Sequence, residues 1–186
     1  MQYIHESHLA CHGKLTSSKY NIMEDLSIRI QLPLPKIIKA GCFENKDICC
    51  RFLWTAPEHL RNSRCDPSPS MDIYSLGIIL HDTIFQNGPF GIYAWPRSEQ
   101  QESTTEMRAK IICEAITRSI PQLRPKCADP PDLDVADQYT PFLKLMMDCR
   151  DEQPENRPNI HVVRHDFQKV RSVCRPYPQI VTSINS

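Results

Sequence analysis

The chain has 186 residues, 40% of them hydrophobic and 24% charged, which is typical of one globular domain. Its 22 Lys and Arg residues balance its 22 Asp and Glu residues, so no net charge favours nucleic acid or an anionic membrane as a partner. The sequence has no apolar run long enough to span a bilayer and no secretory signal pattern, so the chain as given is expected to be cytosolic.

The first quarter of the chain predicts a short helix and a hairpin. Residues 1–11 are typical of the last turn of a helix that leads into a loop. Two apolar runs, at 20–23 and 26–32, suit short antiparallel strands. Pro33 ends the second run, because proline has no N–H to donate within a sheet. Residues 40–52 are predicted to form a loop.

A central helix is predicted after Ser70, which occupies an N-cap position, and it ends at Asn87-Gly88-Pro89. One face carries apolar residues and a glycine at helical spacing, namely Ile73, Leu76, Gly77, Leu80 and Ile84. Ile78 and Ile79 lie on the opposite face, so the helix is apolar nearly all round and is expected in the middle of the domain.

A third helix is predicted after Ser103, which has capping-box spacing to Glu106. Its expected apolar face consists of Met107, Ile111 and Ala115. Four prolines then mark an extended connection, at positions 121, 125, 130 and 131.

Two further helices are predicted in the last third of the chain. One begins at Thr140-Pro141 and has the apolar stripe Phe142, Leu145, Met146 and Cys149. The other follows Arg157-Pro158 and has the stripe Ile160, Val163, Phe167, Val170 and Cys174. Residues 175–186 show no pattern and are expected to be disordered.

The nine cysteines are predicted to be free thiols, because their number is odd and no pair has C-x-x-C spacing. A zinc site at Cys42, Cys49, Cys50 and a histidine is the disfavoured alternative, since adjacent cysteines rarely reach one tetrahedral ion. His161 and His165 have i, i+4 spacing but no third ligand nearby. No metal or other cofactor is therefore predicted.

Three segments resemble the C-terminal lobe of protein kinases in order and spacing. Residues 53–60 (LWTAPEHL) are similar to the A-P-E segment, and residues 71–79 (MDIYSLGII) to the D-x-Y-S-x-G start of the buried central helix. Residues 148–158 (DCRDEQPENRP) are similar to the C-W-x-x-x-P-x-x-R-P segment. The loop at 12–18 (HGKLTSS) resembles H-G-x-L-K-S-S-N in the kinase-homology region of receptor guanylate cyclases, as do LWTAPEHL and Leu123-Arg124-Pro125.

The resemblance implies a fold class and a domain assignment. The fold is expected to be mainly α, a kinase-like C-terminal lobe with a short β-hairpin near the N-terminus. Residues 1–174 would form this lobe, with the small N-terminal lobe and its glycine-rich loop absent from the chain. Because Met1 would truncate a helix that packs on the central helix, Ile78 and Ile79 are expected to be partly uncovered, which predicts poor solubility or a protein partner.

The resemblance also implies structural roles for four residues. Glu58 and Arg157 are expected to form a buried carboxylate–guanidinium pair that ties the A-P-E segment to the last helices. Asp72 is expected to cap the central helix and to accept backbone N–H groups from the loop that contains His12.

The residues needed for phosphoryl transfer are absent when the sequence is aligned on His12. Lys14 occupies the position of the catalytic base, Thr16 that of the loop lysine, Lys19 that of the metal-binding asparagine and Leu32 that of the magnesium aspartate. An ammonium group has no lone pair to accept a proton and repels magnesium. Catalytic, cofactor-binding and metal-binding residues are therefore predicted to be missing.

The expected function is that of a catalytically inactive regulatory module. In receptor guanylate cyclases this region is intracellular, in a single-pass membrane protein, and relays a signal to a cyclase domain, which this chain lacks. The missing N-lobe, a cyclase domain or another protein is the expected partner, with weak ATP binding only in an intact parent. The alternatives are an enzyme, either a divergent ATP-dependent protein kinase fragment or an active cyclase fragment, and a free-standing adaptor.

Overall fold

The computed structural model describes residues 1–24, 28–32, 51–86, 88–90, 105–118 and 133–173. Most of the predicted loop at 40–52, the proline-rich connection and the tail at 175–186 lie outside the described residues. Among the helices described, none has the length and apolar character that a bilayer-spanning segment requires.

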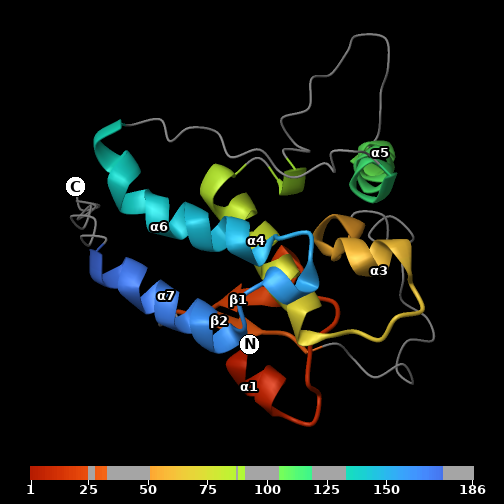
Figure 1. The fold of residues 1–186 in the computed structure, drawn as a ribbon, viewed down its shortest axis with the longest axis horizontal. Coiled ribbons are helices and arrows are strands. Elements are labelled where there is room, and N and C mark those ends of the chain that lie inside the picture. Colours follow the sequence, from red (N-terminus) through yellow and green to blue (C-terminus); the bar gives the residue numbers. More distant parts are fainter. Residues whose placement is uncertain (25–27, 33–50, 87, 91–104, 119–132, 174–186) are drawn as a thin grey trace, which may run out of the picture.

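The described residues form a mainly helical fold with one small antiparallel sheet, which confirms the predicted class at this level (Figure 1). The helices are α1 (Gln2–Glu6), α3 (Pro57–Arg61), α4 (Pro69–Phe85), α5 (Thr105–Arg118), α6 (Leu133–Cys149) and α7 (Ile160–Val173), with 3-10 turns η1 (Ser17–Lys19), η3 (Phe52–Trp54) and η5 (Pro154–Asn156). The predicted hairpin is also confirmed. Its strands are β1 (Tyr20–Ile22) and β2 (Ile28–Ile30), and Tyr20 pairs with Ile30.

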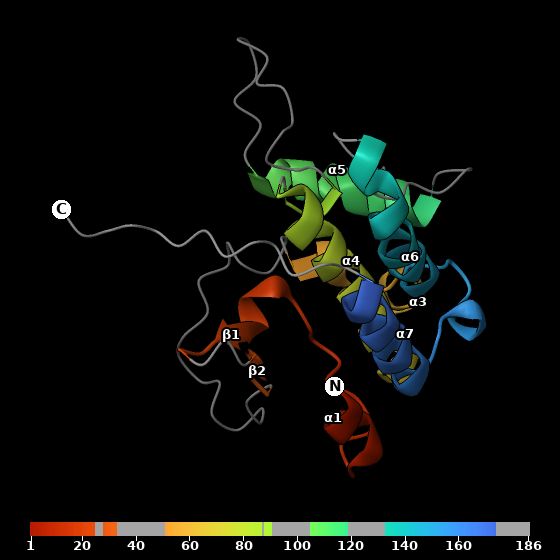
Figure 2. The ribbon, with the colours of Figure 1, turned by 90° about the vertical axis from the view of Figure 1, so that its left-hand side faces the viewer.

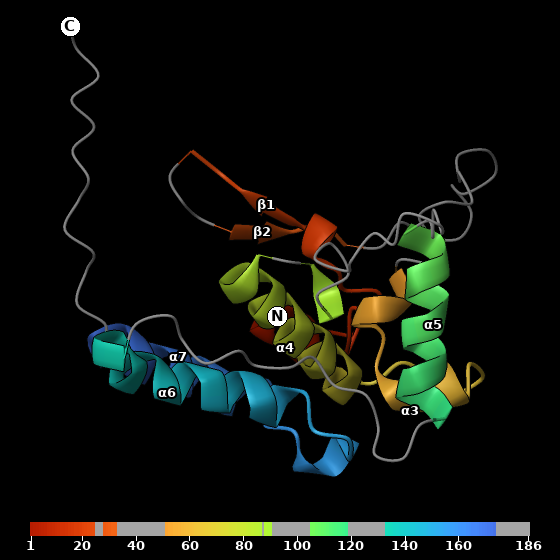
Figure 3. The same cartoon turned by 90° about the horizontal axis from the view of Figure 1, so that it is seen from above.

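Helix α4 lies at the centre of the molecule, as its apolar character predicted. The hairpin lies on one side of α4, and α6 and α7 lie on the other (Figures 2 and 3). Helices α3 and α5 lie together beside α4, on the side away from the C-terminal end of α7 (Figures 1 and 3). The side chains of Ile73, Tyr74, Ile78 and Ile79 are all buried.

The start of α4 differs from the prediction. Ser68, and not Ser70, is the N-cap residue, and Pro69 is the first helical residue. Proline is favoured at this position because its fixed φ angle suits the helix and its missing N–H would have no partner in the first turn. The C-cap residue Gln86 adopts a left-handed conformation with φ of 49°, just before Gly88 and Pro89.

Helices α4 and α6 cross closely at Gly77. A Cβ atom at this position would lie 2.7 Å from Cγ of Arg150 and 2.9 Å from Cβ of Cys149. Such distances are shorter than any van der Waals contact, so the crossing requires the absence of a side chain. The sequence predicted that Gly77 lies on an apolar face of the helix, and the structure shows that a larger side chain would not fit there.

The core has two parts that share α4. One contains Leu53, Trp54, Ile78, Ile79 and residues of α5, and the other contains Ile73, Leu145, Cys149, Ile160 and Val163. The prediction that Ile78 and Ile79 are partly uncovered is therefore wrong. Both are buried, because α5 and the η3 turn pack in the same cluster.

The predicted α5 exists, but its predicted core face is wrong. Met107 and Ile111 are exposed, whereas Ala109, Ile112 and Ile116 are buried. Ile112 and Ile116 pack in the same cluster as Leu53 and Trp54. The buried face of α5 is therefore determined by long-range packing and not by the local spacing of apolar residues. The predicted cap Ser103 lies outside the described residues.

The last two helices agree with the sequence except for one boundary. Helix α6 begins at Leu133, and Pro141 lies inside it, so the predicted start at Thr140-Pro141 is wrong. A proline removes one backbone hydrogen bond but does not have to end a helix whose following turns are well packed. Leu145, Met146 and Cys149 are buried as predicted, and Ile160 and Val163 form the start of the core face of α7.

Candidate functional site

Asp72, near the start of α4, contacts three of the first thirteen residues of the chain, His5, His12 and Gly13. Its Oδ2 atom accepts a hydrogen bond from the backbone N–H of His12 at 2.6 Å, and its Oδ1 atom accepts one from Gly13 at 2.8 Å. Nε2 of His5 lies 3.1 Å from Oδ2, so it donates a third hydrogen bond when it carries a proton. The carboxylate is buried, and these donors replace the water it has lost.

Two local features bring the loop to Asp72. Gly13 has φ of +71°, a left-handed conformation that glycine adopts without strain, and this directs two successive N–H groups at one carboxylate. The His12 ring lies 2.8 Å from the carbonyl oxygen of Gln31, which links the same loop to the hairpin. The predicted contact between Asp72 and this loop is thus present in the structure. The capping role is not seen, since Ser68 occupies the N-cap position.

Glu58 and Arg157, 99 residues apart in sequence, lie together. Nη1 of Arg157 donates to Oε1 of Glu58 at 2.6 Å, and Nη2 donates to Oε2 at 2.9 Å, which is bidentate geometry. The side chain of Arg157 is fully buried, and that of Glu58 is 22% exposed. The structure thus brings together the two residues for which the resemblance implied a pair.

Every donor of the Arg157 guanidinium is used. Besides the two bonds to Glu58, it donates to the carbonyl oxygens of Ser70, Asp151 and Glu152, at 3.2, 2.8 and 3.3 Å. A guanidinium has five N–H donors, and five acceptors surround this one. Its carbon lies 5.1 Å from the centroid of the Tyr74 ring, which adds a cation–π contact.

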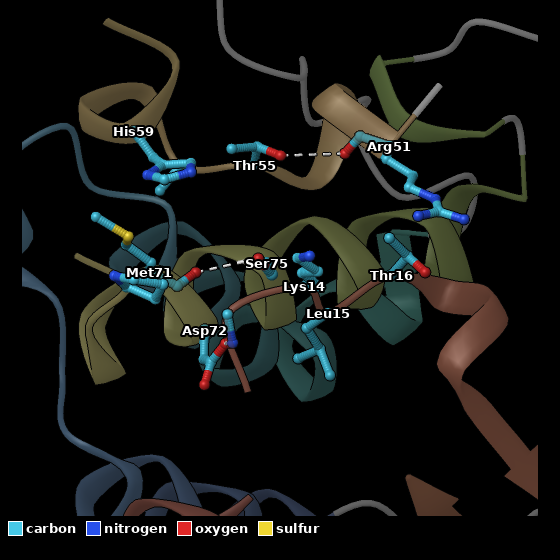
Figure 4. A pocket seen from close by; sticks show the side chains of 12 residues that line it. Lys14, Leu15, Thr16, Arg51, Thr55, His59, Met71, Asp72 and Ser75 are labelled. Carbon is cyan, nitrogen blue, oxygen red and sulfur yellow. Dashed lines mark hydrogen bonds between the residues drawn. The ribbon is translucent and has the colours of Figure 1, made fainter. Parts of the chain in front are cut away.

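A cleft lies beside the loop that carries Lys14 (Figure 4). It consists of a small cavity of about 50 Å³ and a wider hollow of about 500 Å³. The two adjoin, because both are lined by Gly13, Lys14, Arg51, Thr55 and His59. In Figure 4 residues 14–16 are seen over α4, which carries Asp72 and Ser75, and the segment from Arg51 to His59 runs above them.

The four positions aligned with kinase catalytic residues have different surroundings. Lys14 is exposed and lines both parts of the cleft. Thr16 is buried, and its hydroxyl lies 2.9 Å from that of Ser18. Lys19 ends the η1 turn, and Leu32 is half exposed beyond β2. Only Lys14 and Thr16 line the cleft.

The acidic group that lines the small cavity is Asp72, and its oxygens already accept from two backbone amides and face His5. Within the described residues, no three His, Cys, Asp or Glu side chains are arranged to hold a metal ion. His161 faces Glu6 at 3.4 Å, and His165 faces Asp166 at 3.3 Å. The disfavoured zinc ligands Cys42, Cys49 and Cys50 lie outside the described residues.

Cys11, Cys65, Cys113 and Cys149 are free thiols, as predicted for these four positions. Burial raises the pKa of the Cys149 thiol from 9.0 to about 12, and the nearby Asp148 carboxylate acts in the same direction. Burial also raises the pKa of Cys11, with a further contribution from the charge of Asp72. Both thiols are therefore held in the neutral form.

Sequence reasoning missed the roles of three residues. His5 contacts Asp72, and Arg51 and His59 line the cleft beside Lys14. Arg51 lies two positions before the LWTAPEHL segment and belongs to no motif. A tertiary structure was needed to place it next to a residue 37 positions earlier.

The sequence was compared with known proteins. No family model matches it. It is 32% identical over 173 residues to the receptor-type guanylate cyclase gcy-14 of Caenorhabditis elegans, and 31% identical over 184 residues to guanylate cyclase 32E of Drosophila melanogaster. It is 27% identical over 169 residues to atrial natriuretic peptide receptor 2 of Anguilla japonica. These matches cover 91%, 95% and 88% of the chain but only 14%, 14% and 15% of the relatives.

Proposed function

We propose that this chain, which is related to a region of receptor-type guanylate cyclases, is a catalytically inactive regulatory module with a kinase-like fold. The chain spans about one seventh of the length of these relatives, so cyclase activity would reside elsewhere in such a protein. The module is proposed to pass a signal to a cyclase domain through its own conformation and not through phosphate transfer.

The observation that carries this proposal is the charge of the cleft. Lys14 lines the cleft, and in the proposed alignment it takes the position where a protein kinase needs a carboxylate to orient the attacking hydroxyl. An ammonium cannot accept the proton of that hydroxyl. Arg51 lines the same cleft, and Asp72, the one carboxylate among the described residues of the small cavity, accepts hydrogen bonds from the loop. Two cations near a magnesium site would repel the ion at short range.

The scaffold, by contrast, is intact. The Asp72 contacts hold the loop to α4, and the saturated Arg157 holds the segment of Glu58 to the turn before α7. Both involve buried charges, which are costly to maintain unless every hydrogen bond is satisfied. These contacts show a packed fold around the cleft, and together with the proposed absence of catalytic groups they support a role in protein contacts.

The first experiment measures phosphate transfer. The purified chain, with Mg²⁺ and γ-labelled ATP, is expected to transfer no label to itself or to a general protein substrate above the blank. The chain alone is also expected to show no thermal shift with ATP. Transfer that is lost in the Asp72→Asn variant, or in a Lys14→Ala variant, would contradict the proposal and favour the divergent-kinase alternative.

The second experiment measures the relay. In gcy-14 of Caenorhabditis elegans, the matching region is replaced by this chain, and cyclic GMP production is compared with that of a protein lacking the region. The two outputs are expected to differ, and Asp72→Asn in the inserted chain is expected to move the output toward that of the deletion. Equal output from the chimera and the deletion would contradict a relay role.

A further inference from the structure

We infer that the cleft beside Lys14 binds an anionic side chain of a protein segment, either a phosphorylated residue or an acidic one. The wide hollow of about 500 Å³ carries three permanent cations in its lining, Lys14, Arg51 and Arg118, together with His59. Among the residues that the structure describes, this lining contains one acidic residue, Glu114. This local excess of positive charge stands out in a chain whose total charge is zero.

The cations come from three parts of the fold and meet around one volume. Lys14 lies on the loop held by Asp72, Arg51 directly precedes η3, and Arg118 ends α5. Clusters of this kind recognise phosphate or carboxylate groups through charge-assisted hydrogen bonds. Ser63 in the same lining contributes a further hydroxyl, whereas the hydroxyls of Thr55 and Thr117 already donate to the carbonyl oxygens of Arg51 and Cys113.

The rest of the lining is apolar and favours a peptide as the ligand. Phe52, Leu60 and Cys113 also line the hollow, and they can contact aliphatic side chains next to an anionic residue. A volume of about 500 Å³ lies within the ordinary range for ligand sites and holds a few side chains. A free phosphate ion would leave this apolar surface uncovered, and a nucleic acid would require a longer cationic track.

This inference rests on the proposed function. In that proposal Lys14 takes the position of the catalytic base, so the cleft would bind an anionic partner and not a metal-bound phosphate. The two can nevertheless fail separately. The transfer experiment tests the missing chemistry, whereas the binding experiment below tests only the ligand.

The test uses the full chain and three fluorescein-labelled pools of degenerate heptapeptides, with phosphoserine, aspartate or serine fixed at the centre. Fluorescence anisotropy is expected to show the tightest binding for the phosphoserine pool, then aspartate, with serine weaker than phosphoserine by about tenfold. Binding is expected to weaken as salt is raised. Equal binding of all three pools would overturn the inference.

Matched variants locate the site. Arg118→Gln is expected to weaken binding of the phosphoserine pool by about fivefold, the effect of one partly exposed charge. Lys110→Gln removes one charge from an exposed residue of the same helix outside the cleft lining and is expected to leave binding unchanged. Lys14→Gln provides a second cleft variant if Arg118→Gln unfolds. Equal effects of the cleft variants and Lys110→Gln would contradict the location.

Inorganic phosphate distinguishes the source of the anion. If the partner is a protein segment, millimolar phosphate is expected to compete only weakly with the phosphoserine pool. Competition at concentrations similar to those of the peptide would mean that the cleft binds free phosphate, and the protein-segment inference would be wrong.

Discussion

At the scale of single residues, Arg157 shows how this chain accommodates a buried charge. Its five donors have five acceptors, two of them on Glu58 and three on the backbone. The backbone acceptors belong to Ser70 in α4 and to Asp151 and Glu152 after α6. One planar group therefore fixes three segments relative to one another, which a lysine could not do.

Arg157→Lys is expected to lower the free energy of unfolding by about 3 kcal/mol, because it removes the fork geometry and leaves buried acceptors unsatisfied. Urea denaturation followed by circular dichroism measures the loss. Lys144→Gln, which removes one partner of the exposed pair Lys144–Asp148 on α6, serves as the control and is expected to cost about 0.5 kcal/mol or less. Similar losses for the two variants would contradict a special role for Arg157.

Cys149 predicts a dependence of stability on alkaline pH. Because burial raises its pKa from 9.0 to about 12, the unfolded chain loses the thiol proton in this window while the folded chain retains it. The unfolded state is then favoured, so Cys149 contributes a decrease in the free energy of unfolding of up to about 1.4 kcal/mol per pH unit above pH 9.

The unsubstituted chain is compared with the Cys149→Ala variant. The variant is expected to be less stable at pH 8, because the substitution leaves a cavity. Between pH 9 and 11 it is expected to lose less stability than the unsubstituted chain, because it has no thiol to ionise at this position. Urea midpoints at several pH values give both slopes. Parallel slopes in the two proteins would show that the thiol remains no more protonated in the folded state than in the unfolded one.

Site residues could be predicted from the sequence only where a motif surrounds them. Glu58, Asp72 and Arg157 were assigned roles through the segments that resemble the kinase family, and the structure places each beside the expected partner. His5 and Arg51 have no such context. Their roles depend on the folding of α1 and η3 against other parts of the chain, which no local pattern encodes.

At the scale of the elements, helix periodicity predicted which segments are helical better than which face each one buries. Helix α7 has one apolar stripe, and its core face was predicted correctly at Ile160 and Val163. Helix α5 offers two candidate stripes, since Met107 and Ile111 compete with Ile112 and Ile116. When both faces are apolar, the packing partner makes the choice.

Adjacent isoleucines of α5 test this face directly. Ile112 is 1% exposed and Ile111 is 46% exposed. Ile112→Ala is expected to lower the free energy of unfolding by about 2–5 kcal/mol through lost burial and a cavity, whereas Ile111→Ala is expected to cost less than about 1 kcal/mol. Thermal and urea unfolding of the two variants check the order. The reverse order would mean that α5 is rotated.

Gly77 gives a second prediction at this scale. In an open helix, replacing glycine by alanine stabilises the protein, but at the α4–α6 crossing the new methyl group would clash with Arg150 and Cys149. Gly77→Ala is expected to lower the free energy of unfolding by about 1–3 kcal/mol. Thr83→Ala, at an exposed position of the same helix, is the control and is expected to change it little. Stabilisation by Gly77→Ala would show that the helices cross at a greater distance.

At the scale of the whole molecule, α4 belongs to both parts of the core. Ile73 packs with α6 and α7, whereas Tyr74 and Ile78 pack with α5 and η3. The sequence predicted a buried central helix with Ile78 and Ile79 partly uncovered, because it could not show that α5 packs against them. Long-range packing of this kind is the part of the fold that local patterns leave undetermined.

Sharing one helix predicts a single cooperative unfolding transition. Trp54 lies in the part of the core that does not contain Ile73, and a Trp95→Phe background leaves it as the sole tryptophan. Ile73→Ala is expected to lower the urea midpoint equally by Trp54 fluorescence and by far-UV circular dichroism. Separate midpoints for the two probes would mean that the two parts unfold independently.

The Asp72 contacts also have a mechanical consequence. The Asp72 carboxylate on α4 accepts hydrogen bonds from the backbone of His12 and Gly13, immediately before Lys14. A movement of α4 is therefore expected to move Lys14 with it. Arg118 lies on α5 and is not linked to α4 by these hydrogen bonds. A small rotation or shift of α4 would therefore change the distance between Lys14 and Arg118, and the cleft would respond to the position of the central helix.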